Sequence, residues 1–89
     1  MFVLSRRIGE SVVFDNALVA TVADLGTDFV DLSLARIDGT RLGNATLDVR
    51  HLRPVVHGVA GVIVKRLEGH AVRLGFEFAE GISVARSPQ

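Results

Sequence analysis

The sequence predicts an all-β protein, a small antiparallel β-barrel or sandwich of about eight short strands. Two observations favour this class: apolar residues alternate or cluster as β-branched runs, and turn residues such as Asp38-Gly39 and Glu68-Gly69 separate the runs. A third observation argues against helices, because apolar residues never keep three-and-four spacing for three turns. The 89 residues suffice for one small domain, residues 1–89.

Each expected strand is an apolar run that ends at a turn signal. The runs, in chain order, cover residues 2–5, 11–14, 18–23, 29–35, 45–52, 61–67, 71–78 and 82–85. Asp15-Asn16 and Glu68-Gly69-His70 are typical hairpin connections between neighbouring runs. Pro54 follows the fifth run and cannot donate to a ladder, so that strand is expected to be short or at a sheet edge.

Two segments of the chain share one pattern of strand, Gly-containing turn and strand. Residues 18–34 and 60–76 align without a gap at an offset of 42, which places Val22 on Val64 and Leu32 on Leu74. We therefore expect two copies, about 1–44 and 45–89, although alternating hairpins also produce some identities by themselves.

Composition limits the classes of function. Ten basic and ten acidic residues cancel, so a nucleic-acid surface would have to be local, and nine of the ten basic residues are arginine. There is no cysteine, no apolar run long enough to span a bilayer and no signal sequence, which favours a cytoplasmic protein. The three histidines have no metal-ligand spacing, and no nucleophile elbow or phosphate-binding loop occurs. We expect no enzyme, no catalytic residue, no metal and no cofactor.

The opening MFVLSRRIGESVVF resembles the amino-terminal strand and first turn of the carbon storage regulator (CsrA/RsmA) family. Residues 15–34 are similar to the next two strands of that family, and residues 60–86 are similar again, ending in VRLGF and ISVAR. The chain departs from the family in its length, in the loop 78–81 without proline and in the lack of a terminal helix.

The resemblance implies a fold and a function. Family members are homodimers with interlocked strands, and they bind GGA in hairpin loops of messenger RNA. This chain is therefore expected to be a single-chain pseudo-dimer or a homodimer that regulates translation or stability of mRNA after transcription. Its partners would be mRNA or small RNA with GGA loops, with a protein antagonist as a further partner and no membrane.

The resemblance also implies which residues bind RNA. In the family each site combines the first strand of one subunit with the last strand of the other, which here correspond to Leu4, Ser5, Arg6, Arg7, Ile82, Val84 and Arg86. Arginine forks and strand-edge backbone groups can read guanine by hydrogen bonds. Leu4 and Arg6 share one strand face, and Arg7 points to the other. We therefore rank Arg6 and Arg86 above Arg7 for direct contact with RNA, and Arg7 could instead pair with Glu10. A second site would need a last strand at 40–44 and a first strand at 47–56. Both segments keep little of the family's pattern, so we expect one RNA site.

Two other binding functions stay open. Asp31-Leu32-Ser33 and the double arginine also look like parts of PilZ domains, which bind cyclic di-GMP, although Arg36 stands where that motif has glycine. The third interpretation is a family-like domain that has lost RNA affinity and binds a protein. Without the resemblance, a double arginine at a strand end is an edge that resists aggregation.

Overall fold

Residues 1–86 fold into nine strands. A computed structural model describes residues 1–86, with Arg86 described by its backbone. The strands are β1 (Phe2–Arg7), β2 (Ser11–Phe14), β3 (Leu18–Leu25), β4 (Phe29–Arg36), β5 (Arg41–Asp48), β6 (Arg53–Val56), β7 (Val59–Leu67), β8 (Ala71–Phe78) and β9 (Val84–Arg86). The all-β prediction is confirmed. Within residues 1–86 we find no helix that is long and apolar enough to cross a membrane.

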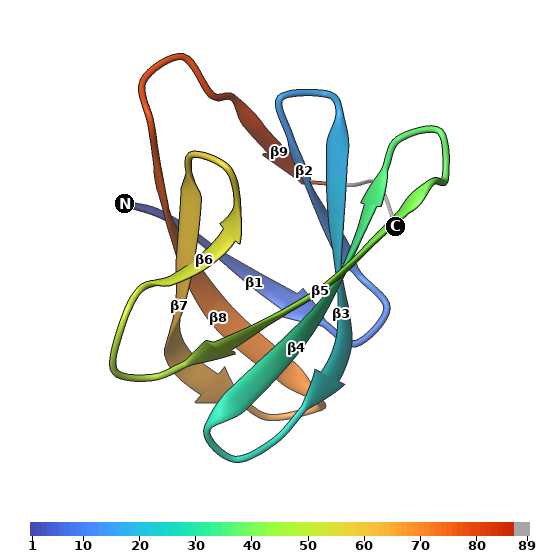
Figure 1. The fold of residues 1–89 in the computed structure, drawn as a ribbon. Coiled ribbons are helices and arrows are strands. Elements are labelled where there is room, and N and C mark those ends of the chain that lie inside the picture. The colour runs from blue at the N-terminus through green and yellow to red at the C-terminus, as the bar shows by residue number, and fades with distance from the viewer. Residues whose placement is uncertain (87–89) are drawn as a thin grey trace.

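The strands form two antiparallel sheets (Figure 1). One sheet has the order β1-β8-β7-β6, and the other has the order β5-β4-β3-β2-β9. The first strand of the chain therefore belongs to a sheet built otherwise from the second half. In the same way β9, the last strand, completes the sheet that contains β2, β3 and β4.

Local turn chemistry explains the tight hairpins. Asp15 and Asn16 have φ values of 56° and 54°. The amide of Ala17 donates to the carbonyl of Phe14 at 3.0 Å and closes a turn around Asp15 and Asn16, within the three-residue connection between β2 and β3. Two consecutive left-handed residues are what a type I′ hairpin turn requires, and Asp and Asn tolerate that conformation better than other non-glycine residues.

Alternating apolar residues from both sheets build the core. Phe14 and Phe76 are 1% and 0% exposed, and their rings meet edge to face with centroids 5.3 Å apart. Phe2 and Phe78 are partly buried against the same core, which leaves Phe29 as the exposed phenylalanine. Stacking of several bases on phenylalanine platforms is therefore not available on the described surface.

The middle of the chain differs from the expected strand at 45–52. β5 begins earlier, at Arg41, and ends at Asp48, after which a turn leads to the separate strand β6. Pro54 belongs to β6 and not to the strand expected at 45–52; β6 has four residues and lies at the edge of its sheet. The single expected strand was wrong because its apolar pattern runs on through Val49 and Leu52, which are exposed residues of the turn.

The two segments that the repeat aligns have similar sheet registers, with one difference from the ungapped alignment. β4 and β8 correspond at the 42-residue offset, but Ile63, not Val64, pairs with Leu74 as Val22 pairs with Leu32. Val22 is accordingly 1% exposed and Val64 48% exposed. The second hairpin holds one residue more between its equivalent pairs, Leu25 with Val30 and Arg66 with Val72, so the offset in β7 falls to 41.

Candidate nucleic-acid interface

β1 supplies four of the residues expected at the interface. It is an edge strand that pairs with β8 on one side only. Leu4 is 2% exposed and packs in the core, Arg6 is half-buried, and Ser5 and Arg7 are exposed on the opposite face. The Leu4 side chain is therefore not accessible to a ligand, and only its backbone lies at the strand edge.

The Arg6 guanidinium is held by backbone carbonyls at the junction of β1 and β2. Its Nε donates to the carbonyl of Ser5 at 2.7 Å, and its Nη1 donates to the carbonyl of Ser11 at 3.2 Å. Ser11 is itself 6% exposed, and its hydroxyl shares a 2.7 Å hydrogen bond with the hydroxyl of Thr21. These contacts fix the direction of the Arg6 guanidinium, which forms no ion pair within residues 1–86.

Arg7 stands at the start of the turn into β2. The Glu10 carboxylate accepts a 2.7 Å hydrogen bond from the Arg7 amide, and the Glu10 amide donates to the Arg7 carbonyl at 2.9 Å. Gly9 has φ 90°, and its amide reaches the carbonyl of Val22 at 2.8 Å, so the turn is tied to β3. The expected pairing of Arg7 with Glu10 thus involves the backbone amide, and the Arg7 guanidinium extends from an exposed residue.

β9 is anchored by the two apolar residues expected to bind RNA. Val84 pairs with Phe14, and both Ile82 and Val84 are partly buried against the core. The carbonyl of Ser83 accepts a 2.7 Å hydrogen bond from the amide of Asp15. Ser83, just before β9, and Ala85 within it are exposed.

The fold brings Arg6 and Arg86 toward the same end of β2. The Arg6 guanidinium bonds to the carbonyl of Ser11, and the next residue, Val12, is the register partner of Arg86. The side chain of Arg86 lies outside the described part of the chain. β9 therefore pairs with β2, and β1 reaches the start of β2 through the bond from Arg6 to Ser11, although β1 and β9 are about eighty residues apart in sequence and belong to different sheets.

The equivalent positions in β5 carry different chemistry. Leu47 pairs with Val30 as Arg6 pairs with Val72, and Leu47 is 0% exposed. The next residue, Asp48, takes the place of Arg7 in the same register. A cationic surface is therefore present in only one of the two corresponding places among residues 1–86.

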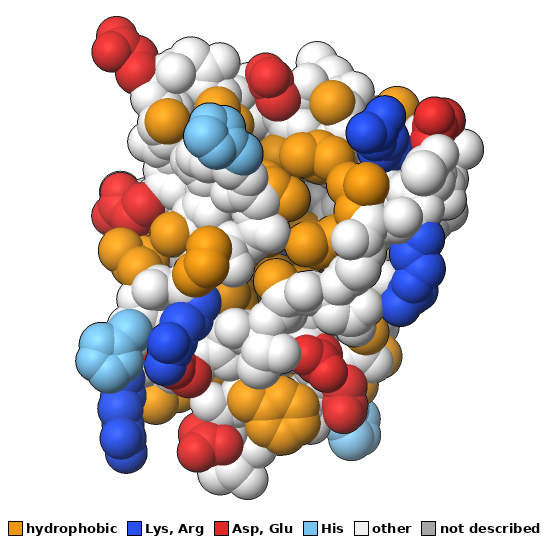
Figure 2. Space-filling view, viewed as in Figure 1, with side chains coloured by type: hydrophobic (Ala, Val, Ile, Leu, Met, Phe, Trp, Pro, Cys, Tyr) orange, Lys and Arg blue, Asp and Glu red, His pale blue; other side chains and the backbone are white. Residues whose placement is uncertain are grey.

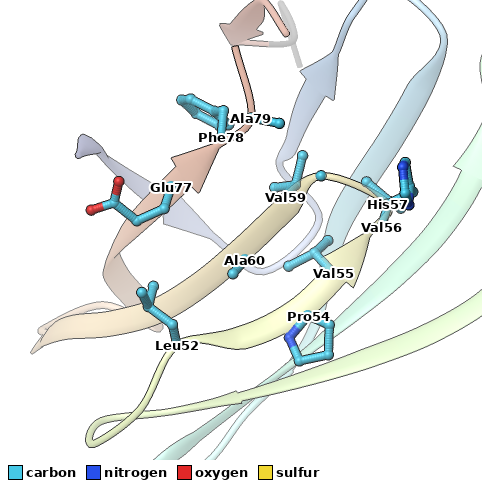
Figure 3. Close-up of a pocket in the computed structure, with 11 residues that line it drawn as sticks. Leu52, Pro54, Val55, Val56, His57, Val59, Ala60, Glu77, Phe78 and Ala79 are labelled. Atoms are coloured by element: carbon cyan, nitrogen blue, oxygen red, sulfur yellow. The ribbon is translucent and has the colours of Figure 1, made fainter.

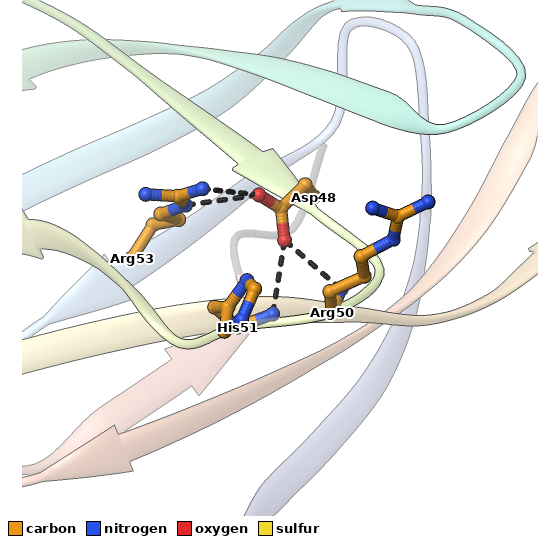
Figure 4. Close-up of polar contacts among 4 residues, drawn as sticks. All are labelled: Asp48, Arg50, His51 and Arg53. Atoms are coloured by element: carbon orange, nitrogen blue, oxygen red, sulfur yellow. Dashed lines mark hydrogen bonds and ion pairs between the residues drawn. The ribbon is translucent and has the colours of Figure 1, made fainter.

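Asp48 organises the turn that follows β5 (Figure 4). One carboxylate oxygen accepts hydrogen bonds from the amides of Arg50 at 2.9 Å and His51 at 3.0 Å. The other accepts from Arg53 Nε at 2.9 Å and forms an ion pair with Arg53 Nη2 at 2.8 Å. The amide of His51, followed by that of Arg50 and the Arg53 guanidinium, holds the pKa of Asp48 well below its usual range.

Sequence patterns did not reveal a groove of about 790 Å³ beside β6 and β7 (Figure 3). Its lining includes Leu52, Pro54, Val56, Ala60, Phe78 and Ala79. The sequence signal for this groove was the apolar residue Leu52, which the pattern assigned to a strand. It lies in the turn instead, and 47% of it is exposed.

Comparisons with known proteins add no assignment. No protein-family model, no curated protein and no solved structure matches the chain. Within residues 1–86, no three His, Asp or Glu side chains gather in an arrangement that could hold a metal ion. The parts of the PilZ-like motif contact different neighbours, since Asp31 accepts a 2.6 Å hydrogen bond from Thr46 while Arg6 bonds to Ser11.

Proposed function

We propose that this protein is an RNA-binding post-transcriptional regulator, a CsrA-like single-chain pseudo-dimer that binds a GGA-containing hairpin loop at one site composed of β1 and β9. The observation that carries the proposal is the exchange of strands between the two halves. β1 pairs with β8, and β9 pairs with β2. Interlocked strands of this kind are what the resemblance of MFVLSRRIGESVVF and ISVAR to that family implies.

The chemistry of this surface suits a single-stranded RNA loop. β1 has a free edge that can present backbone donors and acceptors, and guanine offers acceptors on one edge and donors on another. Arg6 has a fixed guanidinium, and the next residue, Arg7, is exposed on the opposite face of β1. We assign bases to the strand edge and Arg6, and phosphates to Arg7 and Arg86.

The proposal implies one RNA per chain. In β5 the positions of Arg6 and Arg7 are taken by Leu47, which is core, and Asp48, whose charge is used by its own turn. No strand among residues 1–86 pairs with β6 as β9 pairs with β2. Both walls of a second composite site are thus missing from the described chain.

The test is titration of a labelled hairpin with GGA in its loop against the same hairpin with CCA. The proteins are the wild type, Arg6→Ala, Arg7→Ala and Arg86→Ala, with Arg50→Ala as the matched control, because Arg50 is an exposed arginine in the other half. We expect GGA-selective binding that weakens at least about tenfold in Arg6→Ala and Arg86→Ala and is unchanged in Arg50→Ala. Melting temperatures verify that each variant is folded.

Light scattering of the complex determines the stoichiometry. We expect one hairpin for each 9.6 kDa chain. Equal affinity for GGA and CCA hairpins would overturn the proposal. Two hairpins per chain would overturn the single composite site while leaving RNA binding itself in place.

A further inference from the structure

The two sheets have corresponding strand orders, but one sheet has a fifth strand that the other lacks. Starting from β1 or from β5, the order is β1-β8-β7-β6 in one sheet and β5-β4-β3-β2-β9 in the other. β6 takes the place of β2, since Arg53 and Pro54 pair with Gly61 and Ala60 as Val12 and Val13 pair with Ala20 and Val19. β2 is covered by β9, whereas β6 has a free edge among residues 1–86.

The described chain has no strand left for this edge. At the 42-residue offset, residues 42–44 would correspond to Val84–Arg86. Those residues are part of β5 and pair with β4, Gly43 with Leu34 and Asn44 with Ser33. The segment that would cover β6 by internal repetition is thus used elsewhere in the same fold.

The surface around β6 is apolar. The groove of about 790 Å³ is lined by β6, by the turn to β7 and by residues of β7 and β8, so it adjoins the paired side of β6 and not its free edge. Figure 2 shows apolar side chains exposed in a hollow of the molecule, with charged side chains around it. Arg53, the charged residue of β6, is held by Asp48. A free strand edge beside apolar surface is a template for strand addition.

We propose that the β6 edge binds an extended segment of another protein, which adds as an antiparallel fifth strand. The proposal does not depend on RNA binding. β9 on β2 defines the chemistry of the occupant: Ile82 and Val84 point to the core, while Ser83 and Ala85 between and after them are exposed. The partner segment therefore carries apolar side chains at two alternate positions with small or polar residues beside them.

Pro54 favours a foreign strand over a second copy of this chain. A strand with proline provides one donor fewer to any partner. Two β6 strands paired with each other would both lack that donor in a ladder of only four residues each. A foreign strand supplies its full set of donors and acceptors, so the same proline costs that pairing less.

The probe is the capped peptide EGISVAR, residues 80–86 of this chain, because this segment already covers the equivalent edge. Titration into the ¹⁵N-labelled full chain is followed by the shifts of backbone amides. We expect saturable shifts at Val55, Val56 and Ala60, with Val12 and Val13 unchanged. Two control peptides separate the causes: EGKSKAR removes the apolar side chains, and an N-methylated EGISVAR removes backbone donors.

Weak affinity of a short peptide is overcome by a tether. In a second protein, the GISVAR sequence is added after Gln89 through a flexible Gly/Ser linker of about sixteen residues, which raises its effective concentration to about the millimolar range. We expect slower hydrogen exchange at Val55 and Val56 than in the same protein with GKSKAR. The variant Leu52→Lys should weaken both effects, whereas Val64→Lys, at a site of similar exposure (48% against 47%), should not.

Several results would overturn the proposal. The absence of both peptide shifts and tethered protection is one, and equal binding of the N-methylated peptide is another. Shifts confined to β2 and β9 would mean that the peptide merely replaces β9. A concentration-dependent dimer that Leu52→Lys abolishes would assign the edge to a second copy.

Discussion

β1 and β5 occupy corresponding places in their sheets, but two corresponding positions in them carry different side chains with different roles. In β1, Arg6 and Arg7 present charge at a surface, with Arg6 fixed by carbonyls of Ser5 and Ser11. In β5, Leu47 is buried in the core and Asp48 stabilises a turn. The difference teaches that the same two positions carry surface charge in β1, whereas in β5 they contribute to the core and to a turn.

The largest effect is expected when the arginine of β1 is copied into β5. Leu47→Arg places a charge at a position that is 0% exposed and near no carboxylate of the core. We expect a loss of more than about 4 kcal/mol in the free energy of unfolding, or failure to fold, because a buried unpaired charge is costly. Urea unfolding followed by circular dichroism measures it.

The reverse change, Arg6→Leu, is the control for that comparison. Arg6 is half-buried and bonded to two backbone carbonyls, so its replacement should cost about 1 kcal/mol. A stable, folded Leu47→Arg protein would contradict the assignment of Leu47 to the core.

The second prediction concerns the residue that faces Leu47. Gly61 takes the place of Ala20, and a Cβ at Gly61 would lie 2.9 Å from Leu47 Cδ1 and 3.0 Å from Phe76 Cε1. We expect Gly61→Ala to destabilise the protein by about 1–3 kcal/mol through overpacking. In the background of Leu47→Ala the same change should cost clearly less, since the truncated side chain makes room.

A double-mutant cycle from urea unfolding checks this coupling. Ala20→Gly is the matched change in the other half, where we expect a cost of about 1 kcal/mol from backbone entropy and lost packing. Additive effects of Gly61→Ala and Leu47→Ala would contradict the close contact.

The third prediction separates the two halves by function. Arg7→Ala should lower the affinity for the GGA hairpin about three- to tenfold and reduce the dependence of binding on salt, because it removes a phosphate contact. Asp48→Ala should leave hairpin affinity unchanged and lower the melting temperature. Fluorescence titrations at several salt concentrations measure the affinity, and thermal unfolding measures the stability. A loss of hairpin affinity in Asp48→Ala with none in Arg7→Ala would contradict the comparison.

The smallest effect is a change in pH dependence. The pKa of Asp48 is lowered in the folded protein, so its carboxylate stabilises the fold above the unfolded pKa near 4, and this stability is lost as pH falls through the lower folded pKa. Asp48→Asn keeps an oxygen for the amides of Arg50 and His51 but removes the charge. Its stability should therefore fall less than that of wild type between pH 5 and pH 2, as measured by urea midpoints; equal slopes would contradict this role.

Much of the fold could be predicted because alternation is a local signal. The runs around Val12, Val22, Leu32 and Leu74 match strands with the expected buried faces. The start of β5 could not be predicted, since Arg41-Leu42-Gly43-Asn44 has no alternation and Gly43 has φ 122°. The pairing of Ile63 in place of Val64 also escaped, because one additional turn residue and a bulge are not visible in an ungapped alignment.

The candidate site was predictable in part. The sequence and the resemblance placed Arg6 and Arg86 in one interface; in the fold Arg6 bonds to Ser11, and Arg86 is the register partner of the next residue, Val12. The burial of Leu4 in the core and the use of the Arg7 amide by Glu10 depend on side-chain directions, which spacing alone leaves open. The groove beside β6 depends on the absence of a pairing, and sequence patterns predict strands and not their missing neighbours.

The pairing of β1 with β8 also has a consequence for how the chain folds. Leu4 has Leu74 as its register partner, so the first strand must close a loop of about seventy residues before it gains a single ladder bond. During synthesis β1 leaves the ribosome long before its partner, and its apolar side chains remain exposed for that interval. Such a topology is expected to fold in milliseconds to seconds and not in microseconds. We expect the charges of Arg6 and Arg7 to oppose aggregation of this strand until β8 has been synthesised.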